Sequence, residues 1–373
     1  MWMRLSGGSL AVLTAGALAF WAAGAPAAGA SAAAGPAAAG PVCGPLARTA
    51  APAPAILDGV TATSGSDAWA VGSTTARRPQ PVVAHWNGSN WTTVSSPVLQ
   101  TPGVLSAVAK FPGGVWAVGA SQQATGRPRP THLVLAVTGS TARKVPTPRP
   151  RAGSLLGVAA TSATNAWAVG YITAGPPLIL HWNGTAWQRS ALPRHARGRI
   201  DGVAATSAAN AWAIDTPSQG SSQIWHWNGT RWRRVATPAI TGQTYLLTSV
   251  AAISARTAWA AGLTSSSEAT VILHWNGARW RRTPSPNVPD AEGDFLGAVS
   301  ASSADDAWAV GGTIVSGKTL AEHWDGTSWR VVPTPFCGTL AGISILPSGR
   351  AWAVGGPGIL HWNGTAWKSV PLT

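Results

Sequence analysis

The sequence predicts an all-β protein, a seven-bladed β-propeller of four-stranded antiparallel blades. First, a tryptophan motif, "AWAVG" or a near variant, recurs seven times. Second, each copy holds four short segments rich in β-branched or aromatic residues, and none of them has helical periodicity. Third, the copies lie 44 to 51 residues apart, which is the length of a four-stranded propeller blade.

The motif tryptophans define the copies, and they recur at intervals of 47, 51, 45, 47, 49 and 44 residues. They are Trp69, Trp116, Trp167, Trp212, Trp259, Trp308 and Trp352. From these positions, the blades are expected at about residues 57–97, 104–148, 155–193, 200–238, 246–286, 295–335 and 339–373.

The elements of each copy follow in a fixed order. The first strand carries small residues, as in "GVAATS" from Gly157, which suits the crowded centre of a ring. The second strand contains the motif tryptophan, and the third ends in "HW". An Asn-Gly dipeptide, or Asp325-Gly326 in copy six, then favours a type I′ hairpin turn into the fourth strand. Because tryptophan recurs at three positions per copy, we expect the rings to fill the wedge that widens between neighbouring blades.

Two copies depart from this pattern. Copy four has Ile214-Asp215 in place of Val-Gly and holds one additional tryptophan, Trp225. Copy two lacks the histidine and the last two tryptophans of copy one, and it has Ala136, Val137 and Ala142 in their place. Blade two is therefore expected to be thinner at its rim, or to be covered there by another segment.

The first 30 residues have the layout of a secretory signal, with one cation (Arg4), an apolar stretch and small residues before a cleavage site after Ala27 or Ala30. The apolar stretch is too short for a membrane span. Residues 31–56, rich in Ala, Gly and Pro, are expected to form a flexible lead-in. The sequence therefore predicts a secreted, extracellular protein whose mature chain has no membrane span.

Composition and charge exclude several classes of protein. The 22 tryptophans and 45% hydrophobic residues argue against intrinsic disorder, despite 43 glycines and 29 prolines. The glycines have no period of three, which excludes collagen. The 26 basic and 12 acidic residues give a net charge of +14, which favours anionic partners.

The repeats resemble those of a known group of proteins. The segments "GVAATSATNAWAVG" from Gly157 and "ILHWNGTAW" from Ile179 are similar to repeats of secreted bacterial β-propeller proteins, which are mostly uncharacterised and are described as kelch-like or galactose-oxidase-like. The turn "WNGTAW" also resembles a shortened Asp-box of sialidase-like and photosystem-assembly-factor-like propellers. The resemblance covers residues 57–373 and implies the fold, but it implies no particular activity.

The two cysteines predict a disulfide. Cys43 precedes blade one and Cys337 comes just before the first strand of blade seven, and these blades are neighbours in a closed ring. Two cysteines in an exported chain are a natural disulfide pair. The bond would close the ring and, in the chain-entropy model, stabilise it by about 4 to 5 kcal/mol.

The candidate catalytic and metal-binding residues favour structural roles. Six histidines occupy one equivalent position, but they would lie too far apart around the ring to share a metal ion, so we predict that each hydrogen-bonds neighbouring backbone; they are His85, His181, His226, His274, His323 and His361. No metal and no cofactor is predicted. Three acids fall in the first turns of their blades and are expected to cap backbone amides; they are Asp67, Asp305 and Asp306.

One acid pair begins inner strands near the ring axis. Asp58 lies in blade one and Asp201 in blade four, and neither is accompanied by a second acid or histidine motif. The sequence also matches no copper, sialidase, phosphate-loop or serine-hydrolase pattern. The chain is therefore predicted not to be an enzyme.

Arginines cluster after the last tryptophan of two adjacent copies. The clusters contain Arg231, Arg233, Arg234, Arg279, Arg281 and Arg282, and a further group lies in the linker before copy four at Arg194, Arg197 and Arg199. The first two clusters would lie on one side of the rim, where they suit anionic cell-surface polymers, acidic glycans or nucleic acid. The alternative is that arginine is simply the default solvating residue of this composition.

These observations favour a secreted, monomeric, non-catalytic binding or scaffold module at the cell surface, whose partner is a protein or glycan ligand or an anionic polymer. The alternative is a lectin-like protein that recognises glycans through tryptophan and arginine, with Trp225 as the first aromatic contact to test. The least favoured hypothesis is that the protein is an enzyme acting at the mouth of the channel.

Overall fold

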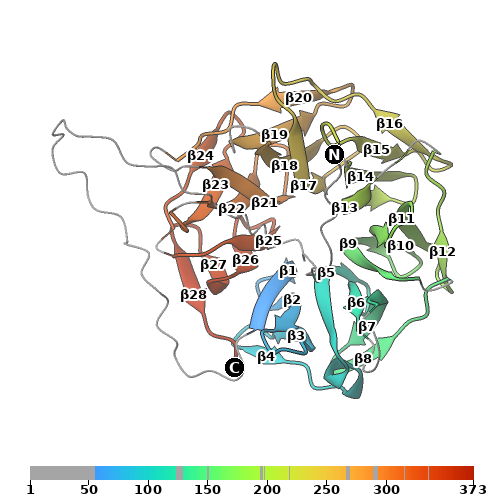
Figure 1. The fold of residues 1–373 in the computed structure, drawn as a ribbon. Helices are drawn as coiled ribbons and strands as arrows, with labels where there is room; N and C mark the ends of the chain where they lie inside the picture. The colour runs from blue at the N-terminus through green and yellow to red at the C-terminus, as the bar shows by residue number, and fades with distance from the viewer. Residues whose placement is uncertain are drawn as a thin grey trace, which may run out of the picture.

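The computed structural model describes residues 55–122, 129–148, 151–193, 196, 198–217, 219–265, 269–288, 293–314, 316–334 and 336–373. In this part of the chain, seven four-stranded antiparallel sheets are arranged around a common centre (Figure 1). The prediction of a seven-bladed β-propeller is confirmed. The predicted signal and most of the lead-in lie outside the described residues.

Within each sheet the strands follow chain order from the centre to the rim. The innermost strands are β1 (Ala55–Ser64), β5 (Gly103–Phe111), β9 (Gly153–Ser162), β13 (Arg199–Ser207), β17 (Tyr245–Ala252), β21 (Asp294–Ala301) and β25 (Leu340–Ile345). The second strands, which carry the motif tryptophans, are β2 (Asp67–Thr74), β6 (Gly114–Ser121), β10 (Asn165–Ile172), β14 (Asn210–Thr216), β18 (Ala258–Thr264), β22 (Ala307–Thr313) and β26 (Ala351–Gly355).

The outer half of each blade is shorter. The third strands are β3 (Pro81–Trp86), β7 (Thr131–Thr138), β11 (Pro177–Trp182), β15 (Ile224–Trp227), β19 (Thr270–Trp275), β23 (Thr319–Trp324) and β27 (Gly358–Trp362). The outermost strands are β4 (Trp91–Thr93), β8 (Thr141–Lys144), β12 (Trp187–Arg189), β16 (Trp232–Val235), β20 (Trp280–Thr283), β24 (Trp329–Val331) and β28 (Trp367–Val370).

Small residues let the inner strands approach one another closely. A β-bulge interrupts the pairing of the first and second strands at the equivalent place in every blade, as at Leu57/Gly59 in β1. Opposite the bulge, six blades carry a glycine in the second strand. A Cβ on Gly262, for example, would lie 1.9 Å from the carbonyl oxygen of Leu246, so no side chain fits there without a backbone shift. Blade four alone has a side chain at this place, Asp215.

Three tryptophans fill six of the seven wedges between blades. The motif tryptophan of one blade contacts the two rim tryptophans of the next, with ring centroids 4.9 to 5.3 Å apart. One partner is tilted and the other meets the ring nearly edge-on, an arrangement that aromatic quadrupoles favour. The expectation that tryptophan fills the outer wedge is therefore confirmed.

The seventh wedge, between blades one and two, is built differently because blade two lacks both rim tryptophans. A 3-10 helix, η1 (Pro97–Gln100), packs against β8 and inserts Leu99 into the cluster around Trp69. Lys110 Nζ lies 5.9 Å from the centroid of Trp69, within cation–π range. Of the two expectations for blade two, the covering segment is the one that the structure contains.

The turn between the third and fourth strands is not the predicted type I′ hairpin. Type I′ needs positive φ at both central residues. Gly184 has a φ of 96°, but Asn183 is not among the positive-φ residues of the described chain. The loop instead spans four residues between paired Trp182 and Trp187, and Asn183 Oδ1 accepts hydrogen bonds from the backbone of Thr185 and Ala186. The asparagine side chain therefore sets this turn.

The ends of the ring meet without exchanging a strand: β1 to β4 form one sheet and β25 to β28 another. The chain end contacts blade one through a bridge between Leu372 and Trp91, and Thr373 N donates a 3.0 Å hydrogen bond to Trp91 O. Trp352 completes the seam by packing against Trp86 and Trp91. These contacts join blades one and seven independently of any covalent link.

Candidate binding surface on the outer rim

The repeated histidines pack within the blades, against the motif tryptophans. Each ring packs on the motif tryptophan of its own blade, with centroids 4.1 to 4.6 Å apart. In four blades the histidine Nε2 lies 2.7 to 3.0 Å from a side-chain oxygen at the start of the second strand; these partners are Asp67, Asn165, Asn210 and Asp306. The predicted backbone partner was wrong, because the first turn presents a closer side-chain acceptor.

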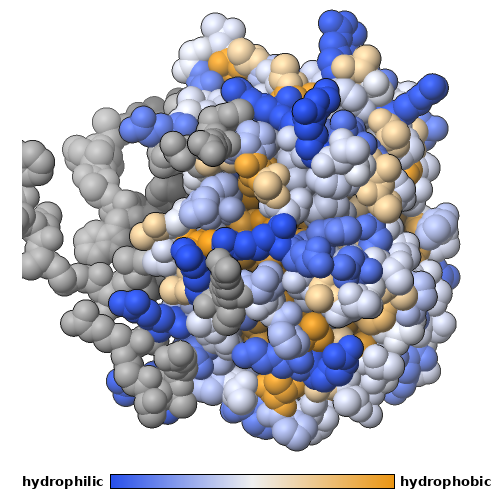
Figure 2. Space-filling view, turned by 90° about the vertical axis from the view of Figure 1, so that its right-hand side faces the viewer, coloured by the Kyte–Doolittle hydropathy of each residue, from blue (hydrophilic) through white to orange (hydrophobic). Residues whose placement is uncertain are grey.

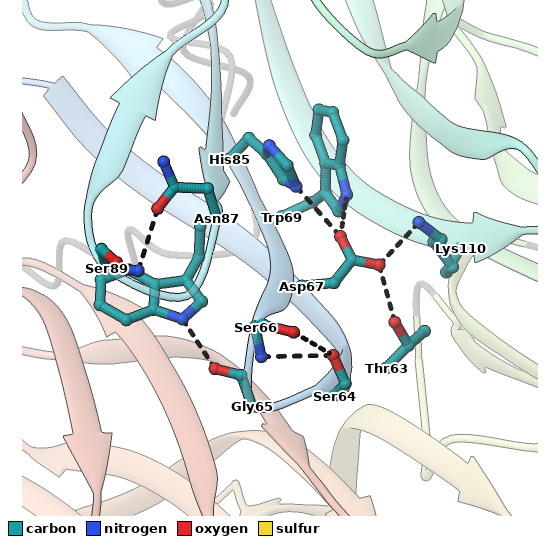
Figure 3. A network of polar contacts seen from close by, with 11 residues as sticks. Thr63, Ser64, Gly65, Ser66, Asp67, Trp69, His85, Asn87, Ser89 and Lys110 are labelled. Atoms are coloured by element: carbon teal, nitrogen blue, oxygen red, sulfur yellow. Dashed lines mark hydrogen bonds and ion pairs between the residues drawn. The ribbon is translucent and has the colours of Figure 1, made fainter.

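Asp67 is the centre of the most connected of these networks (Figure 3). Its carboxylate accepts hydrogen bonds from Trp69 Nε1 at 3.0 Å and Thr63 Oγ1 at 2.8 Å, contacts His85 Nε2 at 3.0 Å, and pairs with Lys110 Nζ at 2.8 Å. Burial opposes ionisation, but the hydrogen bonds from Lys110, Thr63 and His85 outweigh it and lower the pKa of Asp67 to about 2.

The first-turn acids therefore bind side chains rather than cap backbone amides. Asp306 accepts from Ser302 Oγ at 2.7 Å and contacts His323 at 2.8 Å. Lys110, which comes from the innermost strand of blade two, ties Asp67 of blade one to its neighbour. Asp305 is exposed in the turn. The Asp67–Lys110 pair therefore helps to hold blades one and two together.

The inner-strand acids are buried and lie on different blades. Asp58 sits at the bulge of β1, where burial raises its pKa to about 7. Asp201 sits at the equivalent bulge of β13 and pairs with Arg199, whose Nε is 2.7 Å from Oδ1. Burial raises the pKa of Asp201 too, although Arg199 opposes the shift. Each carboxyl is thus held within its own part of the ring.

Trp225 does not lie on an exposed loop, and the interpretation of this residue as a ligand contact was wrong. Its side chain is 0% exposed and packs with Trp167 in the wedge between blades three and four. Its Nε1 donates a 2.8 Å hydrogen bond to Asp215 Oδ2. The two departures of copy four, Asp215 and Trp225, are therefore partners in one buried contact.

The predicted arginine clusters lie at the rim. Arg233 and Arg234 belong to β16, and Arg281 and Arg282 belong to β20, the outermost strands of adjacent blades. Their side chains are exposed, as are those of Arg231 and Arg279 just before these strands. In the linker, Arg194 and Arg197 lie outside the described residues, while Arg199 is engaged with Asp201.

The basic surface extends further than the two clusters. Nine exposed basic residues occupy the outermost strands of six blades, and we call them the cationic rim: Arg143, Lys144, Arg189, Arg233, Arg234, Arg281, Arg282, Arg330 and Lys368. The seven outermost strands carry no acid, and only β4 carries no base. Figure 2, which faces the rim on the side of β12 and β16, shows hydrophilic groups spread over this face between white and orange, more hydrophobic patches.

A sequence signal for the whole rim existed. Each of these bases comes one or two residues after the last tryptophan of its copy, or after Ala142, which replaces it in copy two. Sequence reasoning found only the densest clusters because it looked for runs of arginine rather than for a repeated position.

Two histidines beside the rim, His226 and His274, are neutral at pH 7. Arg233 is paired across the sheet with His226, and Arg281 with His274. Burial lowers the pKa of both histidines. These two histidines therefore add no positive charge behind the outer strands at neutral pH.

Two shallow grooves open beside the rim. One of about 340 Å³ is lined by the blade-five exit Thr283–Pro286 and by Trp324 and Trp329 of blade six. The other, of about 330 Å³, lies where blade three leads into blade four and includes Arg189. Both are adjacent to residues of outermost strands, so they extend the same surface.

The remaining sequence expectations concern the cysteines, membranes and metals. Cys43 lies outside the described residues, so the disulfide stays a prediction. The backbone of Cys337 forms an isolated antiparallel β-bridge with Lys318 beside blade seven. Across the described ranges, no helix is long and apolar enough to cross a membrane. The same ranges contain no group of three or more His, Cys, Asp or Glu residues placed to hold a metal ion.

No protein-family model matches this chain, and no curated protein matches it. Solved structures share its fold. YCF48 from Cyanidioschyzon merolae is 18% identical, with a TM-score of 0.56 over 84% of this chain and 96% of that one. A structure of YCF48 bound to D1 peptide is 16% identical, with a TM-score of 0.50 over 73% and 82% of the two chains.

Two further solved structures are similar in fold. The WD40 β-propeller domain of Doa1 is 8% identical, with a TM-score of 0.57 over 82% of this chain and 92% of that one. Streptogramin B lyase is 13% identical, with a TM-score of 0.54 over 81% and 91%. At these identities the likeness establishes the propeller fold alone.

Proposed function

We propose that this protein is a secreted, non-catalytic binding module that attaches to an anionic polymer at the cell surface through the cationic rim. The observation that carries the proposal is the placement of nine exposed bases on outermost strands that contain no acid. The predicted export signal supports a cell-surface location, and kelch-like or Asp-box-like ancestry of the repeats belongs to the same proposal.

The arrangement suits a polymer better than a small ligand. The bases follow the circumference through six blades, so a flexible chain of regularly spaced negative charges can contact several of them in turn. Each contact releases counterions from the polymer, and this release drives binding without requiring a deep pocket. His226 and His274, behind the rim, are neutral, so the exposed bases alone supply the positive charge on these two strands.

Two comparisons bear on the alternatives. The structure of YCF48 with a D1 peptide supports a binding role for propellers of this shape, whereas streptogramin B lyase has an enzyme's name. The lectin alternative loses its first aromatic candidate, because Trp225 is 0% exposed. Its arginine half is retained in the proposal.

The test compares two variants with the same loss of charge. The rim variant replaces Arg233, Arg234, Arg281 and Arg282 with serine. The control variant replaces four exposed arginines that lie off the rim with serine: Arg77, Arg78, Arg256 and Arg350. Binding of both, and of the mature wild-type chain, is measured on immobilised polyphosphate, with neutral dextran as the blank.

We expect the rim variant to bind polyphosphate about tenfold or more weakly than wild type, and the control variant to bind within about twofold of it. Equal losses in both variants would mean that net charge alone drives the interaction. No binding by wild type would overturn the proposal and direct the search to protein partners.

A further inference from the structure

A polar cluster is buried between blades five and six, separate from the cationic rim. Its centre is Glu322 on β23, whose side chain is 0% exposed. In five blades the equivalent residue, opposite the second alanine of the motif, is apolar, and four of these are leucines at Leu135, Leu180, Leu273 and Leu360. Blade four has Trp225 there. A carboxyl group at this place needs a specific explanation, because burying one is costly.

The side-chain atoms that meet in this cluster are all oxygens. Ser285 Oγ donates a 2.9 Å hydrogen bond to Glu322 Oε2 and lies 2.6 Å from Thr270 Oγ1. Thr270 Oγ1 in turn lies 3.2 Å from Asn287 Oδ1. Asp294, at the start of β21, is a charged neighbour whose charge acts on Glu322.

Two carboxylate oxygens in this cluster have no hydrogen-bond partner among the described residues. They are Glu322 Oε1 and Asp294 Oδ1, and both are buried. No ion pair of the described chain includes either carboxyl group. Buried polar atoms without partners are rare in native structures and commonly mark a site for water or an ion.

We propose that this cluster is a calcium site. The two carboxylates would neutralise Ca²⁺, with Glu322 Oε1 and Asp294 Oδ1 as the charged ligands. The hydroxyls of Ser285 and Thr270 and the amide oxygen of Asn287 supply the remaining protein oxygens. Hard, all-oxygen ligand sets of this kind suit calcium.

The surroundings provide a path for the ion. Ser285 also lines the groove beside Trp324 and Trp329, and Asn287 is exposed. The oxygens therefore run from the surface to the buried glutamate. Burial and the neighbouring Asp294 raise the pKa of Glu322 to about 8.

The test is calcium binding by the chelator-treated full chain, measured by calorimetry and thermal unfolding with CaCl₂, and with MgCl₂ at equal ionic strength. Variants Glu322→Gln and Glu322→Leu remove the charged ligand, and leucine fits the equivalent place in four other blades. Asp58→Asn is the matched control, because it removes another buried acid outside the cluster.

We expect one calcium ion per chain with a Kd of about 0.1 to 1 mM, the range of extracellular calcium modules, and a saturable rise in Tm. Both Glu322 variants should lose the binding and the rise in Tm, while Asp58→Asn keeps them. If millimolar calcium changes neither heat nor Tm of wild type, or if Glu322→Gln responds like wild type, the proposal is wrong.

Discussion

At the residue scale, blade four shows how two departures from a repeat can depend on each other. Asp215 occupies a place that is glycine in the other six blades, and Trp225 replaces a smaller apolar residue. Asp215 Oδ2 accepts from Trp225 Nε1, and Oδ1 accepts from Gln223 N at 2.8 Å. Burial raises the pKa of Asp215 to about 6, although these hydrogen bonds oppose the shift.

Both residues stand out in the sequence as exceptions, but Trp225 was predicted to be a ligand contact. The reason is that Trp225 is paired across the sheet with Ala213, not with Asp215, so strand register alone does not bring the two together. The two side chains meet only because the indole ring of Trp225 points toward Asp215. Side-chain direction at one unusual place is not encoded in a repeat pattern.

The coupling predicts a non-additive pair of mutations. Trp225→Leu leaves a cavity and an unsatisfied buried carboxylate, so it should lower the free energy of unfolding by about 3 to 5 kcal/mol. The double variant Trp225→Leu with Asp215→Gly restores the pattern of the other blades. Denaturant unfolding should show the double variant to be more stable than the Trp225→Leu single variant. Additive losses would contradict a direct contact.

At the element scale, most of each blade followed from the sequence, but the turns and the buried polar groups did not. The strand order and the tryptophan wedges depend on periodic residues, which a sequence displays directly. The type I′ turn failed because the side chain of Asn183 binds the loop's own amides, which lengthens the loop to four residues. The Glu322 cluster was missed because its oxygens come from four separate elements: β19, the segment after β20, β21 and β23.

The buried Glu322 should make the free energy of unfolding depend on pH. Comparing wild type with Glu322→Leu isolates this effect. The pKa of Glu322 is about 8 in the folded chain and near 4.5 when unfolded. Between these values the folded state holds a proton that the unfolded state has lost, so stability falls as pH rises. In calcium-free buffer, Glu322→Leu should therefore gain on wild type from about pH 4.5 to 8, by at most about 1.4 kcal/mol per pH unit.

Urea unfolding of the two chains at several pH values measures this difference. Asp58→Asn, compared in the same way, should level off near pH 7, where the pKa of Asp58 lies. A difference between Glu322→Leu and wild type that is constant from pH 4.5 to 8 would show that Glu322 ionises freely in the folded chain.

At the scale of the whole molecule, ring closure combines contacts that the structure describes with one bond that stays a prediction. The chain end meets blade one through Leu372 and Thr373 against Trp91, but blades one and seven share no strand among those described. A closed ring of this kind depends on its seam, because opening there exposes the aromatic wedge of Trp86, Trp91 and Trp352 to water.

The disulfide prediction is tested by thiol titration of the denatured, unreduced chain. A Cys43–Cys337 bond leaves no reactive thiol, and adding reductant should lower the free energy of unfolding by up to about 4 to 5 kcal/mol. The double variant Cys43→Ser with Cys337→Ser should be insensitive to reductant. Two reactive thiols in the wild-type chain would refute the bond.

The distribution of charge is also a property of the whole molecule. Most of the described acids lie near the blades' inner and middle strands, Asp305 and Asp325 lie in turns, and Asp325 pairs with Arg330, while the outermost strands themselves carry bases only. Net charge was evident from composition. Its placement around the rim required the strand order, because residues more than 200 positions apart, such as Arg143 and Lys368, share this surface only in the closed ring.

The salt dependence of polyphosphate binding tests the central claim most directly. For wild type, log K should fall linearly with log salt concentration, and each rim contact removed should make the slope shallower by about 0.7 to 0.9. Replacing Arg233, Arg234, Arg281 and Arg282 with serine should therefore flatten the slope markedly, while the off-rim control keeps the wild-type slope. Identical slopes for all three chains would contradict binding through the cationic rim.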